Sequence, residues 1–347
     1  MKVDRYNLNN ETLSMWLHAP TSVGGIARQR SGDEHKCRNF GTDKLLHPDL
    51  TEDHAFNTAL ARVRPSDVPI LSVLTTDALR TTRIPKFNAT AMVWGLPFLP
   101  VGSNSCRWPH NGFRWLARSY AAATAHLAQH SPRQVAVVMD SQDAFVQGSA
   151  EEIRAALRTA GRPLVLVLES GCARKRCTTP MPHPGEEANS SLLIGIPDLT
   201  HINGGVVVGE AHALATMWRF VANNTYTGNR IIHQHSAQHG IGKFVRAHPE
   251  LMAFDRTQSL AAVINSPPAG QGGVHEWSRF YDLETLTPSR SANGLVVRQR
   301  VINRATRRAP CFVHVPGTQE YKRKWGYMNE TMRAWDTISQ VLVPTRL

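Results

Sequence analysis

Cysteine and long apolar runs are both scarce in this chain of 347 residues. Its five cysteines (Cys37, Cys106, Cys172, Cys177 and Cys311) are too few to indicate a disulfide scaffold. Cys172 and Cys177 are equally consistent with a small disulfide loop and with two free thiols. No stretch reaches the roughly 18 consecutive apolar residues that a membrane span needs. We therefore expect neither a disulfide-dense fold nor a membrane span, and the chain is long enough to bury a sizeable core.

Signatures of several large enzyme classes are also missing. There is no G-x-S-x-G elbow of a serine hydrolase, no G-x-x-x-x-G-K-[ST] loop for a nucleoside triphosphate, and no G-x-G-x-x-G after the first predicted strand. A histidine-rich stretch carries His233, His235 and His239, but it lacks the Glu of an H-E-x-x-H zinc motif. A zinc site and a polar loop both remain interpretations of this stretch. Hydrolase, kinase and dehydrogenase functions are disfavoured.

The sequence leaves the cellular compartment open. No apolar h-region occurs in the first thirty residues, so no signal peptide is recognisable. N-x-S/T sequons nevertheless occur, and they matter only for a chain that enters the secretory pathway. The sequons are at Asn10, Asn88, Asn189, Asn223 and Asn329.

The formal charge of the chain is strongly positive, +12 at pH 7. Basic residues cluster at 174–176, 298–308 and 322–324. Such a field attracts polyanions, among them nucleotide-sugars and nucleic acids, although the solvated faces of an arginine-rich protein explain it equally well. No aromatic residues interleave with these clusters, as a platform for single-stranded nucleic acid requires. A nucleic-acid partner is compatible with the charge but supported by no motif.

Two regions differ in their patterning. Residues 1–65 are polar with weak periodicity, which predicts an irregular N-terminal arm, and residues 66–347 are expected to form a single domain. Apolar strands alternate with amphipathic helices from residue 69 to about residue 221, which predicts an α/β fold with a mainly parallel sheet flanked by helices. Ser149 and Glu152 predict a capping box for one of these helices. The expected strands are 70–74, 91–94, 134–139, 163–169, 206–209 and 311–314, and the expected helices are 113–127, 150–160, 210–221 and 332–342.

The strongest functional signal lies at residues 137–146, where an apolar strand ends in Asp140 and Asp143. Strand ends of this kind face the crevice in which open α/β sheets bind ligands. Two carboxylates there suit Mn²⁺ or Mg²⁺ holding a diphosphate, whereas the plainer interpretation is a solvated turn. His314 also follows an apolar strand, so the three side chains could converge on one metal. That metal would act as a Lewis acid on a departing nucleoside diphosphate.

A second signal is Asn203-Gly204-Gly205 directly before an apolar run. Without side chains on the two glycines, the backbone can approach a ligand closely. Taken alone, the same pattern is also typical of an ordinary turn.

In chain order, these pieces resemble the glycosyltransferase domain of the procollagen lysyl hydroxylases (the PLOD-type glycosyltransferases) and the related procollagen galactosyltransferases. The resemblance covers about residues 68–325. The matching segments are Leu74-Thr75, Asn111-Gly112-Phe113-Arg114-Trp115-Leu116, Asp140-Ser141-Gln142-Asp143, Leu166-Val167-Leu168-Glu169 before Cys172, Ile202-Asn203-Gly204-Gly205, Ser236-Ala237-Gln238 and His314.

The resemblance implies a GT-A-like (Rossmann-like) fold and a hexosyltransferase that uses a UDP-sugar and Mn²⁺ (or Mg²⁺). The acceptor would be a hydroxyl group, hydroxylysine-linked or otherwise protein-bound. It implies that Asp140, Asp143 and His314 bind the metal and that Gln238 lies on the acceptor side. The residues implied around the donor are Thr75, Thr76, Arg114, Trp115, Gln142, Asn203, Gly204, Gly205 and Lys322.

Departures from the family pattern leave three functional hypotheses. Gln142 replaces the aromatic residue that stacks on uracil in the family, and Ser236-Ala237-Gln238 replaces an acidic D-D-Q cluster. His235 and Asp255 are candidates to take the place of the missing acidic residues, and a retaining reaction would tolerate their loss. The hypotheses are a metal-dependent UDP-sugar glycosyltransferase, a glycosyltransferase of hydroxymethylated DNA bases, and an inactive binding module. The sequence does not decide between a retaining and an inverting reaction, nor does it name the donor sugar.

Overall fold

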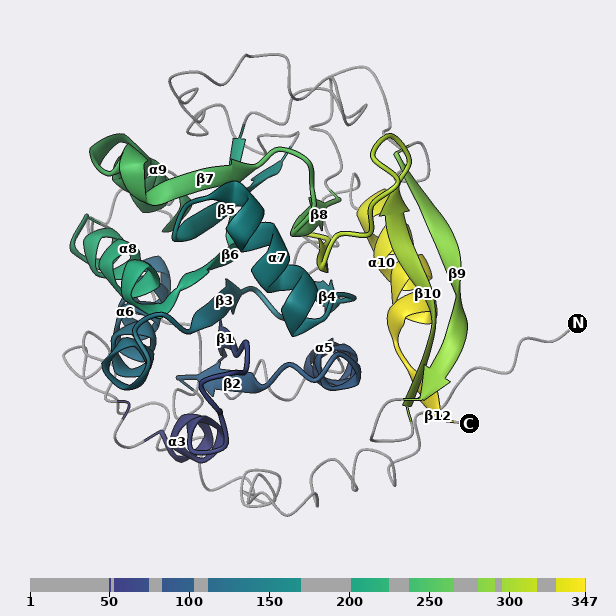
Figure 1. Cartoon of the computed structure of the whole chain (residues 1–347), viewed down its shortest axis with the longest axis horizontal. Helices are drawn as coiled ribbons and strands as arrows, with labels where there is room; N and C mark the ends of the chain where they lie inside the picture. Colours follow the sequence, from purple (N-terminus) through teal and green to yellow (C-terminus); the bar gives the residue numbers. More distant parts are fainter. Residues whose placement is uncertain are drawn as a thin grey trace, which may run out of the picture.

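A six-stranded sheet forms the centre of the computed structural model (Figure 1). The structure describes residues 50, 53–74, 83–102, 112–169, 201–224, 237–264, 280–290, 295–316 and 329–346. The order of the strands in the sheet is β2 (Phe98–Val101), β1 (Ile70–Val73), β3 (Val135–Met139), β6 (His201–Glu210), β5 (Leu164–Glu169) and β7 (Met252–Asp255).

Strand β6 runs antiparallel to both of its neighbours, β3 and β5, while the other pairs in the sheet are parallel. The first residues of β6 therefore lie at the edge where the parallel strands end. His201 is paired with Glu169 at the end of β5, and Val206 with Met139 at the end of β3. The predicted α/β fold with a mainly parallel sheet flanked by helices is confirmed.

Helices cover both faces of this sheet (Figure 1). The first face carries α6 (Gly112–His130), α8 (Ala211–Asn224) and α9 (Ala237–Ala247), and the second carries α5 (Arg83–Val93) and α7 (Ala150–Ala160). Successive side chains of a strand point to opposite faces. In β5 the three leucines accordingly join the core under α6, α8 and α9, and the two valines join the core under α5 and α7. This burial on both faces explains why β5 is apolar from Leu164 to Leu168.

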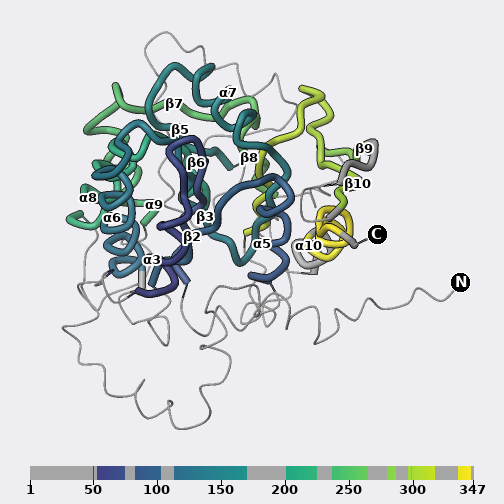
Figure 2. The backbone as a smooth tube through the Cα atoms, turned by 60° about the horizontal axis from the view of Figure 1, so that its bottom comes forward, coloured from purple at the N-terminus to yellow at the C-terminus, as the bar shows by residue number. Residues whose placement is uncertain are grey.

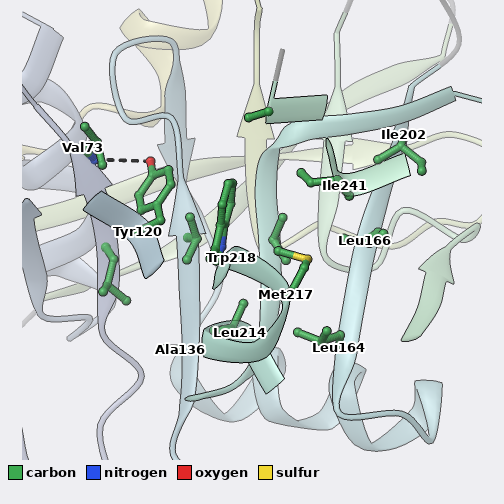
Figure 3. Packing of buried hydrophobic residues seen from close by; sticks show 14 of the residues in the cluster. Val73, Tyr120, Ala136, Leu164, Leu166, Ile202, Leu214, Met217, Trp218 and Ile241 are labelled. Atoms are coloured by element: carbon green, nitrogen blue, oxygen red, sulfur yellow. Dashed lines mark hydrogen bonds between the residues drawn. The ribbon is translucent and has the colours of Figure 1, made fainter. Parts of the chain in front are cut away.

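Tyr120 and Trp218 anchor the larger of the two cores (Figure 3). Their ring centroids are 4.7 Å apart, at the contact between α6 and α8. The Tyr120 hydroxyl accepts a hydrogen bond from the backbone N–H of Val73 and donates one to the carbonyl of Met139. Because those residues end β1 and β3, one side chain ties α6 to the edge of the sheet where two parallel strands finish.

Two small sheets complete the described structure. One has the order β4 (Ala144–Val146), β11 (Phe312–His314), β8 (Ala261–Val263), and the other has the order β12 (Thr345–Arg346), β10 (Leu295–Asn303), β9 (Tyr281–Arg290). Helix α10 (Asn329–Leu342) lies beside the hairpin of β9 and β10, on the opposite side of the molecule from α6 and α8 (Figures 1 and 2). Trp335 of α10 contacts Phe145 of β4, with ring centroids 4.3 Å apart. This contact joins the outer hairpin layer to the sheet that contains His314.

Most of the expected elements occur where they were predicted. Helix α7 begins at the predicted capping box: Ser149 Oγ accepts from the N–H of Glu152, and the Glu152 side chain accepts from the N–H of Ser149. The strand predicted at residues 91–94 is wrong, because residues 91–93 end α5 and β2 is the second strand. Ile84, Phe87 and Ala91 are the buried face of that helix. The outer hairpin β9–β10 and helix α9 were not predicted.

Part of the arm expected to be irregular is packed against the sheet. Helix α3 (His54–Leu60) lies within residues 1–65, and its Phe56 is fully buried. Asp53, the N-cap, accepts a hydrogen bond from the N–H of Phe56 (3.2 Å) and one from the N–H of Gly102 just after β2 (2.7 Å). Residues 1–49 lie outside the described residues, and the domain boundary at residue 65 stays a prediction. Among the described helices, none has the length and apolarity needed to cross a membrane.

We expect the substitution Asp53→Ala to lower the free energy of unfolding by about 1–3 kcal/mol, because buried N–H groups lose their acceptor. Glu284→Ala on the exposed side of β9 is the control, and we expect it to change this free energy by less than about 0.5 kcal/mol. Chemical denaturation of both variants measures the difference. Equal values for the two would contradict the packing of α3 on β2.

Candidate metal centre

Backbone and side-chain hydrogen bonds fix the turn between β3 and β4. The N–H of Asp140 donates to the carbonyl of Gly205 in β6 (2.8 Å). The hydroxyl of Ser141 is hydrogen-bonded to the hydroxyl of Ser72 in β1 (2.8 Å). The turn is thus held by β6 on one side of β3 and by β1 on the other, and this sets the position of the carboxylates that it carries.

His314 reaches the same place from a different sheet. It is the last residue of β11, where it is paired with Ala144 of β4 and Val263 of β8. The N–H of the next residue, Val315, donates to the carbonyl of Asp143 (2.7 Å). Because β11 is paired with β4 directly after the turn, the imidazole of His314 lies beside the carboxylate of Asp143. The Nε2 atom of His314 is 3.1 Å from the Oδ1 atom of Asp143.

Asp140, Asp143 and His314 form a compact set of candidate metal ligands. One ligand atom from each lies within 4.8 Å of the others, and within the described ranges no other group of three or more such side chains is this close together. Asp143 is 2 % exposed and His314 is 3 % exposed, whereas Asp140 is half-buried. The site is therefore closed on the side of His314 and more open at Asp140. The arrangement suits a divalent cation that keeps coordination positions free for oxygen atoms of a ligand.

Gly205 makes room for the imidazole. A Cβ atom on Gly205 would collide with Cε1 of His314 and would lie 2.9 Å from its Nδ1 atom. The neighbouring Gly204 has no such restriction, because a Cβ atom there would lie 3.5 Å from Gln238, an ordinary contact. The Asn-Gly-Gly pattern predicts that another group lies close to this backbone. In the described structure, the group that lies close to Gly205 is the imidazole of His314. The roles expected for the two glycines around a donor sugar stay predictions.

A buried chain of hydrogen bonds continues from His314 away from the two aspartates. The Nδ1 atom of His314 is 3.1 Å from Asn203 Oδ1. Asn203 Nδ2 donates to Glu169 Oε2 (2.9 Å), and Gln238 Nε2 donates to Glu169 Oε1 (2.9 Å). Gln238 also donates to the carbonyl of Ile202. The chain joins the predicted acceptor-side residue Gln238 to the predicted metal ligand His314.

Glu169 is a site residue that the sequence analysis missed. The sequence indicates only that it ends an apolar strand, yet it is 7 % exposed and in direct contact with both Asn203 and Gln238. The signal was present: Glu169 ends β5 in the same way that Asp140 follows β3. Polar residues at the end of a buried strand in a mainly parallel sheet are candidates for a ligand site, and this applies to Glu169 as it does to Asp140.

Neighbouring carboxylates determine the protonation of His314. Burial by itself lowers the pKa of this imidazole. The negative charges of Asp143, Asp140 and Glu169, together with the contact to Asp143, outweigh burial and raise the pKa above its ordinary value of 6.5. Without a metal, the imidazole therefore holds a second proton more tightly than an exposed histidine does.

Of the other residues predicted on the donor side, the structure describes Arg114, Trp115 and Gln142. Trp115 is buried at the start of α6 and packs against Gly102, where a Cβ atom would lie 2.7 Å from its ring. Arg114 and Gln142 are both half-buried, and no hydrogen-bond partner of Arg114 Nε is present in the described part of the chain. Thr75, Thr76 and Lys322 lie outside the described residues, as do His233 and His235.

Asp255, suggested as a replacement carboxylate, holds a turn. Its oxygens accept from the N–H groups of Ser259, Leu260 and Ala261 at 2.7–3.0 Å, and from the Ser259 hydroxyl at 3.1 Å. Burial raises the pKa of Asp255, and these hydrogen bonds offset only part of that effect. The carboxylate thereby fixes the connection from β7 to β8, which is paired with β11. Its catalytic role stays a prediction.

Three arginines of the middle basic cluster form ion pairs within the protein, and a nucleic-acid partner stays a prediction. Arg304 and Arg307, from the middle cluster, both form ion pairs with Asp282 (2.6 and 3.1 Å). Arg300 pairs with Glu152 (2.9 Å) and lies over the ring of Trp94, 4.1 Å from its centroid. These arginines are engaged within the protein. The clusters at 174–176 and 322–324 lie outside the described residues.

Comparisons with known proteins give distant likenesses to glycosyltransferases. Neither a family model nor a curated protein matches the sequence. A solved glycosyltransferase involved in the glycosylation of the major capsid of PBCV-1 is similar, with 12% identity and a TM-score of 0.43, over 74% of this chain and 98% of that chain. Mouse xyloside xylosyltransferase 1, in its apo form, is similar with 10% identity and a TM-score of 0.34, over 57% of this chain and 87% of the other. At such distances these likenesses assign no activity to this chain.

The two glycines provide a matched pair of variants. We expect Gly205→Ala to displace the imidazole of His314 and to weaken Mn²⁺ binding by at least about tenfold, because one ligand leaves its position. Gly204→Ala, with an ordinary contact at its Cβ atom, should bind Mn²⁺ as the wild type does. Titration calorimetry on both variants measures the effect. Similar affinities for the two would show that His314 is not a ligand.

Proton competition predicts the pH dependence of metal binding. A metal needs the lone pair of a His314 ring nitrogen, and the raised pKa keeps that ring protonated to a higher pH than usual. Mn²⁺ affinity should therefore rise with pH, and below the pKa of His314 it should fall by about tenfold for each pH unit. His314→Gln should bind more weakly and with a shallower slope. The same slope in both proteins would contradict the assignment.

Proposed function

We propose that this protein is a metal-dependent glycosyltransferase with a GT-A-like arrangement, which moves a sugar from a UDP-sugar to a hydroxyl acceptor. The observation that carries the proposal is the convergence of Asp140, Asp143 and His314 at the edge where the parallel strands end. Open α/β sheets bind their ligands at that edge. Two carboxylates and one imidazole leave room for the oxygens of a diphosphate, and this is the use that the sequence resemblance implies for the same three residues.

The chemistry of the ligands favours Mn²⁺. The carboxylates of Asp140 and Asp143 are hard oxygen ligands, which Mn²⁺ and Mg²⁺ both prefer. Imidazole is a better ligand for transition metals than for Mg²⁺, so His314 shifts the preference toward Mn²⁺. When bound, the metal would neutralise the charge that develops on the departing UDP.

Beyond metal binding, we assign residues of the centre to binding of the donor or of the acceptor. Asp140 is the most exposed of the three ligands and would be the one most accessible to an entering diphosphate. The resemblance puts Gln238 on the acceptor side, where the family has an acidic cluster. Residues 236–238 carry no carboxylate, but Gln238 donates a hydrogen bond to the carboxylate of Glu169. This carboxylate supports an acceptor site for a hydroxyl group. The resemblance to the procollagen enzymes makes a protein-bound hydroxyl, such as a hydroxylysine-linked one, the first acceptor to test.

Release of UDP from a panel of UDP-sugars in the presence of Mn²⁺ tests the function. We expect turnover with at least one donor, and a loss of about 100-fold or more in Asp143→Asn, because the charge that holds the metal is removed. Asp282→Asn is the control, since Asp282 forms ion pairs with Arg304 and Arg307 away from the metal centre. It should keep wild-type turnover.

Two results would contradict the proposal. Full activity in Asp143→Asn would exclude a metal-dependent reaction at this centre. No turnover with any UDP-sugar, in a folded protein that binds Mn²⁺, would favour the inactive binding module.

A further inference from the structure

Each ring nitrogen of His314 faces an oxygen atom. Nδ1 lies 3.1 Å from Asn203 Oδ1, and Nε2 lies 3.1 Å from Asp143 Oδ1. A neutral imidazole has one N–H and one lone pair, and only the nitrogen with the lone pair can bind a metal. The nitrogen that carries the proton therefore decides whether His314 presents a lone pair to the aspartates or away from them.

The surroundings of Asn203 fix the orientation of its amide. Its Nδ2 group donates to Glu169 Oε2 (2.9 Å), and a carboxylate oxygen can only accept. Its Oδ1 atom accepts from the N–H of Gly205 (2.9 Å), which can only donate. Rotating the amide by half a turn would place oxygen against oxygen and N–H against N–H, and both hydrogen bonds would be lost. The atom that faces the imidazole is therefore the oxygen, which must accept.

Glu169 is itself held in place. Its second oxygen, Oε1, accepts from Gln238 Nε2 (2.9 Å) at the start of α9, and its side chain lies among buried groups at the end of β5. The direction of every hydrogen bond from Gln238 through Glu169 to Asn203 follows from the donor and acceptor chemistry of the side chains. The last group in this series is the Nδ1 atom of His314.

We propose that Asn203, oriented by Glu169, is a positioning residue that keeps the proton of neutral His314 on Nδ1, so that the lone pair of Nε2 faces Asp140 and Asp143 and is available to a divalent cation. Most metal-binding histidines donate the N–H of their other ring nitrogen to a partner of this kind, which orients the ring. The inference rests on the proposed function only in taking the cation to be the metal of the donor site.

The same interpretation accounts for the whole Asn203-Gly204-Gly205 pattern at this centre. Asn203 accepts from the imidazole, the N–H of Gly205 keeps the amide oriented, and the missing Cβ atom of Gly205 leaves space for the ring. Gly204 has no contact of this kind with His314, and it faces Gln238 instead. The pattern thus serves the orientation of one histidine side chain.

Mn²⁺ affinity is the first measurement, with Mn²⁺ alone as the probe and free Mn²⁺ counted by electron paramagnetic resonance. Asn203→Ala should bind Mn²⁺ about 10–100-fold more weakly than the wild type. Gln147→Ala is the matched control: Gln147 is a buried amide that bonds to Val301 and to the carbonyl of Pro310, so its loss costs stability but leaves the imidazole untouched. Wild-type affinity in Asn203→Ala, or an equal loss in the control, would overturn the proposal.

The position of the proton is the second measurement, and it needs no donor. Nitrogen chemical shifts of ¹⁵N-histidine-labelled protein saturated with diamagnetic Mg²⁺ distinguish an N–H at Nδ1 from one at Nε2, and the signals absent from His314→Gln identify the ring. With the cation bound, the wild type should carry the proton on Nδ1. In Asn203→Ala, which lacks the acceptor at Nδ1, a larger share of the proton should be on Nε2, where Asp143 accepts it.

A wild-type proton on Nε2 would overturn the proposal, even if Asn203→Ala failed to fold. The measurements distinguish a failure of the role proposed for Asn203 from a failure of the proposed function. Absence of turnover with all UDP-sugars would remove the proposed function and leave the proton measurement valid. Turnover together with a wild-type proton on Nε2 would leave the function and remove the role of Asn203.

Discussion

The reversed direction of β6 is the constraint on which the site depends. A parallel strand in this position would bring its last residues to the edge where β1, β3 and β5 end. Because β6 runs the other way, Asn203 and Gly205 lie at that edge, and Gly205 accepts the backbone hydrogen bond that fixes Asp140. The small sheet of β4, β11 and β8 then adds His314 from the side. The central sheet and the small sheet therefore meet at the metal centre. The turn after β3 carries the two aspartates, and β11 carries His314.

Several charged side chains are buried where the two sheets meet. Asp143 and Glu169 are buried, Asp140 is half-buried, and the described residues place one imidazole among them. Burying a carboxylate costs free energy unless hydrogen bonds or an opposite charge offset that cost. Glu169 is offset by the amides of Asn203 and Gln238. His314 lies beside Asp143, and the charges of both aspartates raise the pKa of its imidazole.

How much of this could be predicted depends on the kind of signal. The helix at 150–160 and the proximity of Asp140, Asp143 and His314 followed from local patterns, a capping box and polar residues at strand ends. The direction of β6 did not, because the periodicity of a strand is the same in both directions. Without that direction, Glu169 and Asn203 had no reason to be neighbours. The error at residues 91–94 has a local cause, since a window of four apolar residues cannot distinguish a strand from a buried helix face.

The same physics bears on whether these side chains form a metal centre or are only part of a folded scaffold. A scaffold that needs only to fold gains stability when buried charged groups are replaced by apolar residues of similar volume. Here the buried charges are kept, and Gly205 has a backbone position where any side chain would displace His314. The amide of Asn203 is oriented by partners on both sides. An arrangement that holds one imidazole in one orientation is expected where a ligand is bound, and it supports the metal centre on which the proposed function rests.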